Sequence, residues 1–263
     1  MEILLTGACG GLGKALVQQL VNQHPEHLVL WLTDRDDAQL TQFCEQLATG
    51  DSKGRLTIRT LALDLCQEDA SERLQRWLEG ARLTLVFNNA GIASGGAFDA
   101  LPEAEWQRCL EVNLMAAIRV ARSSLPYLGR GSTLINIASM AAIANAPFMA
   151  AYNVSKAALL SLSETLRLEW QPKGIQVSVV CPAFFDTPLL DSLNQEGQGV
   201  AKVARKMMTK SELSAEDVAG YILKQAQRGE FMILPHGKSR QAWRLKRWLP
   251  EQFYKIILKQ SFR

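Results

Sequence analysis

The sequence predicts an α/β protein with one doubly wound parallel sheet of about seven strands and helices on both faces. Short apolar runs of strand length recur along the chain and alternate with longer segments whose apolar residues follow helical spacing. That alternation is typical of βαβ units, in which helices cover both faces of a parallel sheet. No Pro/Gly/Ser-rich linker and no repeat beyond the βα unit interrupts the alternation, so a single domain is expected.

The predicted strands are short runs rich in Leu, Ile and Val. They cover residues 2–6, 28–33, 56–63, 83–88, 133–138, 175–181 and 231–234. The predicted helices lie between them and cover residues 11–22, 36–48, 68–78, 103–125, 150–170 and 215–227. A long segment without a clear strand, about 183–214, follows the sixth strand and is expected to form a substrate lid at the ligand-binding edge of the sheet.

Composition and charge exclude several classes of protein. With 48% hydrophobic and 21% charged residues, the chain has the profile of a globular protein, and its net charge of +3 does not indicate a nucleic-acid partner. The five cysteines are odd in number and widely separated along the chain. They are therefore expected to be reduced core residues that form no metal site. An apolar start without a secretory leader, and no apolar run of roughly 18 residues, predict a cytoplasmic protein.

A glycine-rich turn follows the first predicted strand and opens the first helix. Residues 6–13 read Thr-Gly-Ala-Cys-Gly-Gly-Leu-Gly. Gly7 is expected to turn the chain tightly, Gly11 to let the backbone approach a pyrophosphate, and Gly13 to allow close packing of helix on strand. The backbone N–H groups of this turn, including that of Leu12, and the helix dipole favour phosphates. Its place between strand and helix therefore favours a dinucleotide site over a plain structural turn.

Acidic residues stand at the ends of the second and third predicted strands. Asp34, about 20 residues beyond the glycine turn, can accept hydrogen bonds from an adenosine ribose and repel a 2′-phosphate, which favours NAD(H). Arg35 comes next and can pair with that phosphate instead, so NADP(H) stays open as the cofactor. Asp64, followed by Leu65, ends the third strand, where a lone Asp is otherwise a turn residue or helix cap.

Tyr152 and Lys156 lie four residues apart, on one face of a predicted helix. A phenol with a pKa near 10 is a poor proton-transfer group at neutral pH, and a nearby ammonium is expected to lower that pKa by favouring the phenolate. Such a pair occurs by chance in many helices. Two further polar residues change its meaning: Ser139 closes the fifth strand, and Asn113 lies within the long predicted helix 103–125.

Together these motifs resemble those of the short-chain dehydrogenase/reductase family in its small, single-domain form. Residues 6–13 match the family spacing Thr-Gly-x-x-x-Gly-x-Gly, and residues 88–91, Asn-Asn-Ala-Gly, resemble a second family motif at the end of the fourth strand. The gap from Ser139 to Tyr152, with Lys156 and the Val-Asn-Leu around Asn113, matches the family's tetrad. The resemblance spans roughly residues 2–188, reaches more loosely to residue 234, and does not cover the tail.

This resemblance implies a Rossmann-type fold and NAD(P)-dependent hydride transfer between nicotinamide and a carbonyl or secondary alcohol. Tyr152 would be the general acid in carbonyl reduction and the base in alcohol oxidation, and Ser139 would orient and polarise the substrate oxygen. Lys156 would tune Tyr152 and grip the nicotinamide ribose. Asn113 would hold a water that connects Lys156 to solvent, by kinking its long helix.

Further cofactor contacts also follow from the resemblance. They would come from Asn89, Ala90 and Gly91, from Asp64 and Leu65 at the adenine amino group, and from Pro182 and Thr187 near the nicotinamide carboxamide. Ala183 replaces the glycine usual in the family, so the backbone can turn differently there. Pro182 is equally well explained as a strand terminator.

The loops expected to set specificity, residues 94–98, 143–149 and 189–213, are largely apolar. The residues that would line an apolar pocket are Ile143, Pro147, Phe148, Met149, Phe184, Phe185, Leu189 and Leu190. They indicate a lipophilic small-molecule substrate. Packing of half of them between lid and sheet would explain the same pattern equally well.

Residues 238–263 form a basic, aromatic C-terminal tail after the predicted domain 1–237. From Arg240 to Arg263 the only acidic residue is Glu251, and Trp, Phe, Tyr, Leu and Ile residues lie between the basic ones. A helix of this composition can lie in a membrane interface, here the inner membrane face, can cap the pocket, or can pack against a second subunit. A homodimer or homotetramer is expected.

Two functions besides the oxidoreductase stay open. The first is a non-catalytic dinucleotide sensor that reports redox state to a partner, although an intact tetrad counts against it. The second is a membrane-surface enzyme or scaffold recruited by the basic tail. An epimerase or dehydratase is disfavoured, because the larger substrate domain of such enzymes has little room in this chain.

Overall fold

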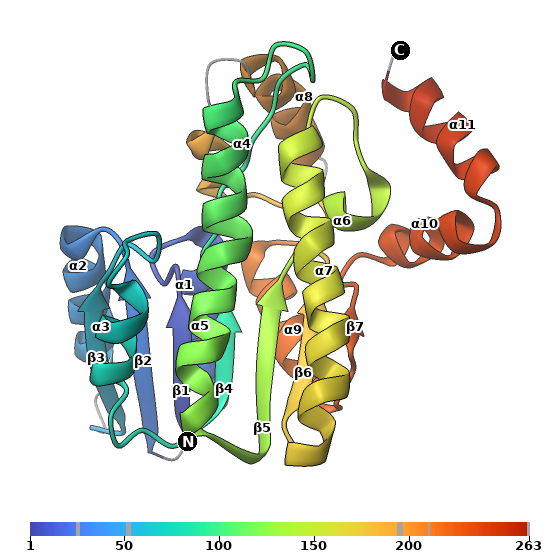
Figure 1. Ribbon diagram of the computed structural model, residues 1–263. Helices are drawn as coiled ribbons and strands as arrows, with labels where there is room; N and C mark the ends of the chain where they lie inside the picture. The colour runs from blue at the N-terminus through green and yellow to red at the C-terminus, as the bar shows by residue number, and fades with distance from the viewer. Residues whose placement is uncertain (25–26, 51–53, 194–196, 210, 262–263) are drawn as a thin grey trace.

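Seven parallel strands form one sheet in the computed structural model, which describes residues 1–24, 27–50, 54–193, 197–209 and 211–261. The strands are β1 (Glu2–Thr6), β2 (Leu28–Asp34), β3 (Leu56–Ala62), β4 (Leu83–Asn88), β5 (Leu128–Ile137), β6 (Gln176–Val180) and β7 (Met232–Ile233). Their order across the sheet is β3-β2-β1-β4-β5-β6-β7 (Figure 1). The predicted doubly wound parallel sheet is confirmed. Residues 194–196 and 210 of the predicted lid, and Arg263 of the tail, lie outside the described residues.

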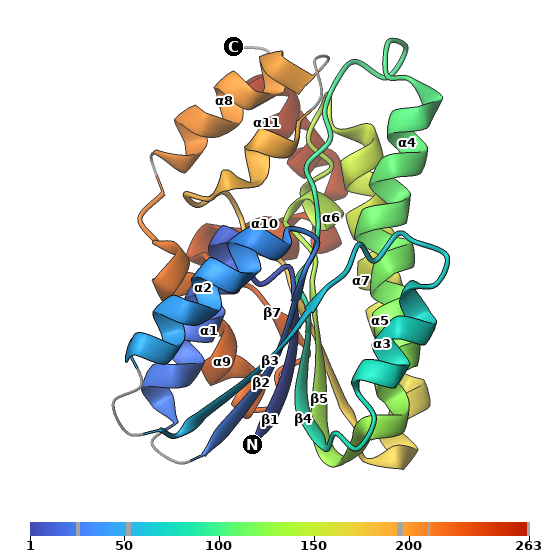
Figure 2. The ribbon, with the colours of Figure 1, turned by 90° about the vertical axis from the view of Figure 1, so that its left-hand side faces the viewer.

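Helices cover both faces of the sheet (Figure 2). One face carries α1 (Gly11–Gln23), α2 (Asp37–Gly50) and α9 (Ala215–Gln227). The other carries α3 (Ala70–Trp77), α4 (Glu103–Leu110), the π-helical turn η1 (Glu111–Met115), α5 (Ala116–Ser124) and α7 (Ala150–Trp170). Near the carboxyl ends of the strands lie α6 (Ala141–Ala144), α8 (Gln198–Met208), α10 (Gly237–Trp248) and α11 (Pro250–Ser261). The short 3-10 turns are η2 (Leu125–Tyr127), η3 (Gln171–Lys173) and η4 (Pro188–Ser192).

The central strand shows why the strand sequences are continuous apolar runs. Ile3, Leu4 and Leu5 of β1 are all fully buried. Ile3 and Leu5 belong to the core beneath α1 and α9, whereas Leu4 belongs to the core beneath α3 and α5. Successive side chains of a strand point to opposite faces, so a strand covered on both sides needs an apolar residue at every position.

Local signals set several helix ends. Ser214 and Asp217 form a capping box at the start of α9, in which each side chain accepts the backbone N–H of the other residue, at 3.1 and 2.9 Å. Asn145 adopts the left-handed conformation, with φ of 52°, and ends α6. Pro250 opens α11 directly after Leu249, the C-cap of α10, so the predicted tail helix is two helices with a turn between them.

Most elements match their predicted bounds within two residues, and three segments need comment. β5 begins at Leu128, which pairs with Leu83 of β4, and its exposed early residues 129–131 hid this start from the apolar pattern. The predicted helix 103–125 is interrupted by η1. The predicted lid contains η4 and α8. The predicted helices 150–170 and 215–227 match α7 and α9.

All five cysteines are free, as predicted. Cys109 and Cys181 are buried, but the other three are only half-buried, so the prediction that all are core residues is wrong for those. Among the described residues, no helix combines the length and apolarity needed to cross a membrane.

Candidate active site

A cleft of about 710 Å³ opens at the carboxyl edge of the sheet, with the ends of the neighbouring strands β1 and β4 in its wall. The strand order reverses at this point, which is where open α/β sheets bind ligands. Every predicted site residue except Gly13 and Asn113 lines the cleft. Residues from seven separate regions of the chain thus meet at one place.

The glycine turn is so closely packed at Gly7, Gly11 and Gly13 that a side chain at any of these three positions would make a close contact. Gly7 has φ of +65°, and a Cβ on it would lie 2.9 Å from Ala90 Cα. A Cβ on Gly13 would lie 2.2 Å from the carbonyl oxygen of Gly7, so α1 can begin here only with glycine. A Cβ on Gly11 would meet Thr187 Cγ2 at 3.1 Å and Pro188 Cδ at 3.0 Å. Gly11 therefore also lets the segment after β6 reach the turn.

The Asn89 side chain holds the glycine turn in place. Its Nδ2 donates to the backbone oxygens of Thr6 and Gly7, both at 2.9 Å. In return Thr6 Oγ1 accepts the N–H groups of Asn89 and Ala90, both at 3.1 Å. The Asn89 side chain thus acts as a positioning group for the turn.

Asp34 is fixed at the rim of the cleft. Its Oδ2 accepts the N–H of Cys9 in the glycine turn at 2.9 Å, and its Oδ1 accepts the N–H of Asp36 at 3.4 Å. Arg35 is exposed beside it. Asp64 Oδ1 accepts the N–H of Cys66 at 2.9 Å, as expected for a turn-forming Asp.

Tyr152, Lys156 and Ser139 face one another across α7 and the end of β5. Lys156 Nζ donates to the backbone oxygen of Ile137 at 3.0 Å and lies 5.9 Å from the centroid of the Tyr152 ring. Ser139 Oγ accepts the N–H of Ala141 at 3.1 Å, and the Ser139 side chain acts on the Tyr152 hydroxyl so as to lower its pKa. Helical spacing on α7 and the strand end therefore bring the three side chains together.

Asn113 sits in the π-helical turn η1, which confirms the predicted irregularity of its long helix. Its Oδ1 accepts the N–H of Ile92 at 2.9 Å, and its Nδ2 donates to Ile92 O and Ser155 Oγ, both at 3.0 Å. A Cβ on Gly91 would lie 3.0 Å from Asn113 Oδ1 and 3.2 Å from Lys156 Nζ. Gly91 therefore lies between the two side chains.

Burial dominates the protonation of the two ionisable groups. It raises the pKa of Tyr152 to about 12, against the lowering effect of the Ser139 hydrogen bond. It lowers the pKa of Lys156 to about 8. The prediction that the pKa of Tyr152 is lowered is therefore wrong for this structure, because burial removes the hydration that would stabilise the phenolate. The phenol carries its proton at neutral pH.

We expect Lys156→Met to stabilise the protein without added dinucleotide by roughly 1–2 kcal/mol at pH 7, because an apolar side chain of similar length replaces a buried ammonium. The pKa of Lys156 in the folded state, about 8, lies below its ordinary 10.5. The unfolded chain therefore binds more protons between these values, and wild-type stability should rise with pH across this window. Urea denaturation from pH 7 to 10 measures both effects.

The matched control for this prediction is Lys173→Met, at an exposed lysine. Its stability should stay within about 0.5 kcal/mol of wild type at each pH. A Lys156→Met variant that is less stable than wild type at pH 7, or that follows the same pH dependence, would contradict the burial argument.

Sequence reasoning missed residues that follow β7. His236 Nδ1 accepts the N–H of Ala183 at 3.2 Å, and so supports the turn at which this chain departs from the family's glycine. Lys238, Ser239 and Ala242 of α10 line the cleft. No local pattern singles out these positions, because only the packing of α10 brings them to the cleft.

The predicted apolar lining is right in part. Met149, Phe184, Phe185, Leu189 and Leu190 line the cleft, whereas Ile143, Pro147 and Phe148 do not. Ile143 is buried in a core cluster that Trp243 of α10 contacts, and Phe148 is exposed. The sequence could not show which of these residues line the cleft, because the direction of the loop after α6 depends on the left-handed turn at Asn145.

The fold and the cleft together have the arrangement in which doubly wound α/β proteins bind dinucleotides. The family model described as short chain dehydrogenase matches residues 2–198. This chain belongs to the short-chain dehydrogenase/reductase family.

Known proteins are similar to this chain in sequence and in fold. An uncharacterized short-chain type dehydrogenase/reductase, y4vI, of Sinorhizobium fredii is 30% identical over 218 residues, which cover 82% of this chain but only 38% of that longer protein. A crystal structure of a short-chain dehydrogenase/reductase from Burkholderia phymatum in complex with NAD superposes with a TM-score of 0.83 at 23% identity, covering 95% of this chain and 94% of that one. A short-chain dehydrogenase from Sphingobium yanoikuyae in complex with NADPH gives 0.77 at 24% identity, covering 100% and 96%.

Proposed function

We propose that this oxidoreductase transfers hydride between NAD(H) and the carbonyl or secondary alcohol group of a lipophilic small molecule. The observation that carries the proposal is the convergence of the Tyr152 hydroxyl, the Ser139 hydroxyl and Lys156 in the cleft that the glycine turn opens. When bound, the dinucleotide would supply or accept the hydride.

The side chains have distinct roles in this proposal. Tyr152 would donate its proton to the carbonyl oxygen, and Ser139 would orient and polarise that oxygen. Lys156 would bind the nicotinamide ribose, and Asn113, across Gly91, would hold a water that connects Lys156 to solvent. Because the pKa of Tyr152 is raised to about 12, reduction is favoured at neutral pH, and oxidation should gain as pH rises.

The residues around the cleft fit a dinucleotide. The backbone N–H groups of the glycine turn, Leu12 included, open α1 and suit a pyrophosphate. In this proposal Asp34 would contact a ribose, Asp64 and Leu65 would contact an adenine, and Pro182 and Thr187 would contact the nicotinamide carboxamide. Ala90 and Gly91 would contact the dinucleotide through their backbone.

The apolar side chains Met149, Phe184, Phe185, Leu189 and Leu190 favour a lipophilic substrate. Purified protein should oxidise NADH when it is offered lipophilic ketones and aldehydes, and should prefer them to carboxylated or phosphorylated analogues of equal size. Equal or faster turnover of the charged analogues would contradict the substrate class. Tight NADH binding without turnover on a broad panel would instead favour a dinucleotide sensor.

Cofactor choice is the next prediction. We expect wild-type protein to bind NADH more tightly than NADPH, because the fixed Asp34 carboxylate repels a 2′-phosphate. Asp34→Asn keeps an acceptor for the Cys9 N–H but removes the charge, so the ratio Kd(NADPH)/Kd(NADH) should fall about tenfold or more. Arg35→Ala should raise the same ratio. Fluorescence titration of both reduced dinucleotides measures it.

Asp37→Asn is the matched control for the cofactor prediction, since Asp37 begins α2 and lies outside the cleft lining. It should leave the ratio unchanged. Tighter binding of NADPH than NADH by wild type would show that Arg35 outweighs Asp34.

Assembly and location stay predictions. We expect the protein to form a homodimer or a homotetramer, since most oligomers are symmetric assemblies of identical chains. We expect it to be located in the cytoplasm.

A further inference from the structure

The C-terminal arm, defined as residues 237–263 and containing α10 and α11, differs in charge from the rest of the chain. Residues 237–263 carry eight Lys and Arg residues against one Glu, a net charge of +7. Residues 1–236 carry 21 basic and 25 acidic residues, a net charge of −4. The modest overall charge therefore conceals two segments of opposite sign, and the proposed hydride transfer does not account for the positive one.

The arm also exposes large apolar side chains. Trp248 is 76% exposed and Leu258 56%, and Leu249, Tyr254 and Ile256 are exposed as well. These five lie within eleven consecutive residues, whereas the other exposed large apolar residues of the described chain are scattered along the sequence. An exposed cluster of this kind marks an interaction surface.

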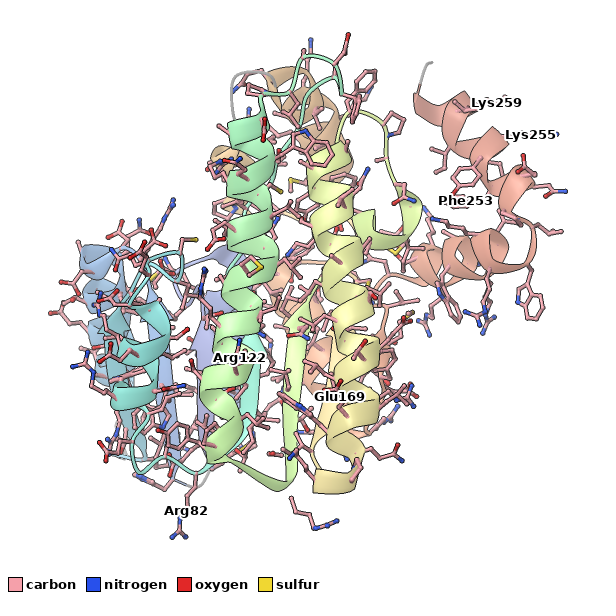
Figure 3. The ribbon with its side chains drawn as sticks, viewed as in Figure 1. Arg82, Arg122, Glu169, Phe253, Lys255 and Lys259 are labelled. Atoms are coloured by element: carbon pink, nitrogen blue, oxygen red, sulfur yellow. The ribbon has the colours of Figure 1, made fainter. Side chains whose placement is uncertain are left out.

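The arm is anchored to the body on its inner side. Lys246 Nζ donates to the backbone oxygen of Ile143 at 2.6 Å, and Trp243 packs against the core cluster of Ile143 and Leu234. Phe253 of α11 is only 3% exposed. Figure 3 shows Phe253 on the side of α11 that faces the body and Lys255 pointing away from it. In Figure 1 the arm projects beside α6 and α7.

Helical spacing places basic and apolar side chains together on the outer face of α11. Lys255 and Lys259 are four residues apart, as are Tyr254 and Leu258, so each pair forms one row along the helix. Around the helix axis, the lysine row lies roughly opposite the buried Phe253, and the row of Tyr254 and Leu258 lies beside the lysine row. Trp248 and Leu249 extend the exposed apolar surface at the turn from α10 into α11.

We propose that the outer face of the arm docks the protein on an anionic lipid surface, with Trp248, Leu249 and Leu258 entering the interface and Lys255 and Lys259 contacting headgroups. A lipid surface satisfies both properties of the face, since apolar groups enter the acyl boundary while lysines attract anionic headgroups. A second copy paired through the same face would bring together two segments that each carry a net charge of +7, and these would repel each other. Nucleic acid would match the charge but leave Trp248 and Leu258 unaccounted for.

Docking would also place the cleft near the lipid, because Lys238, Ser239 and Ala242 of α10 line it. A lipophilic substrate could then enter from the membrane. This consequence rests on the proposed function, whereas the docking itself does not.

The test is sedimentation of the full chain with vesicles of phosphatidylcholine alone or with about one third phosphatidylglycerol. We expect binding to the anionic vesicles at least tenfold stronger than to the neutral ones. The double variant Trp248→Ser/Leu258→Ser should lose at least tenfold in affinity for anionic vesicles, and Lys255→Gln/Lys259→Gln should lose most of the preference for them. Phe98→Ser, at a residue 74% exposed on the body, is the matched control and should bind like wild type.

Two outcomes would overturn the docking proposal. One is anionic vesicle binding that Trp248→Ser/Leu258→Ser leaves unchanged. The other is no binding of the wild-type protein to anionic vesicles; a concentration-dependent dimer that the same variant dissociates would then assign the face to a second copy. Turnover of a small, water-soluble ketone should be equal in wild type and this variant, so a failure of hydride transfer is distinguishable from a failure of docking.

Discussion

Replacing Tyr152 with phenylalanine is expected to lower kcat for carbonyl reduction by about 10²–10⁴-fold while dinucleotide binding stays within a few fold of wild type. The substitution removes only the hydroxyl that would donate the proton, and the buried ring that packs with Leu101, Cys109 and Met149 remains. The measurement is steady-state reduction of a lipophilic ketone with NADH, paired with a binding titration of the cofactor.

The pH dependence of this reaction gives a second check on the role of Tyr152. Its pKa is raised to about 12 in the free protein, so reduction, which needs the phenol, should hold across neutral pH, whereas oxidation, which needs the phenolate, should rise with pH. Tyr152→Phe should abolish both dependences. Tyr127→Phe is the control, since its hydroxyl donates to Gln75 O at 2.9 Å and Tyr127 does not line the cleft. Turnover by Tyr152→Phe equal to wild type would refute the mechanism.

A single methyl group at Gly13 is expected to be the most damaging change to the glycine turn. The Cβ of Gly13→Ala would lie 2.2 Å from Gly7 O and 3.0 Å from Ala8 O, and both are backbone atoms that cannot move without opening the turn. We expect a loss of about 3–5 kcal/mol in the free energy of unfolding and a loss of at least tenfold in NADH affinity. Urea denaturation and fluorescence titration measure the two effects.

The matched control is Gly220→Ala, the same substitution inside α9. A Cβ there would meet only Gln19 side-chain atoms at 3.8 Å, which is ordinary contact. It should stabilise the protein by roughly 0.5–1 kcal/mol, because alanine is the better helix former. The decisive result is that the free energy of unfolding falls in Gly13→Ala and rises in Gly220→Ala. A Gly13→Ala variant as stable as wild type would contradict the packing described for the turn.

The sheet and most of the site could be predicted from local sequence, for a physical reason. A strand buried on both faces needs an uninterrupted apolar run such as Ile3 to Leu5, and an amphipathic helix needs apolar residues at helical spacing, so both leave a periodic trace. Parallel strands end at one edge of a sheet, so residues that follow them, such as Asp34 and Ser139, necessarily meet there.

Other features depended on groups distant in sequence. The family resemblance predicted an irregular helix at Asn113, but not that it is a π turn in which Asn113 is hydrogen-bonded to Ile92 and Ser155. The raised pKa of Tyr152 also lay beyond the sequence, because it depends on how much protein surrounds the phenol. An ammonium four residues away is visible in the sequence, whereas the loss of water around a hydroxyl is not.

Sequence alone determined the alternation of strands and helices, the glycine turn and the spacing of Ser139, Tyr152 and Lys156, because each can be read from the order of residues along the chain. Tertiary structure decided the protonation of Tyr152, the exclusion of Ile143 from the cleft and the approach of Lys238 and Ser239 to it. Those properties arise from packing between segments far apart in the chain, and no local pattern records which surfaces such segments will bury.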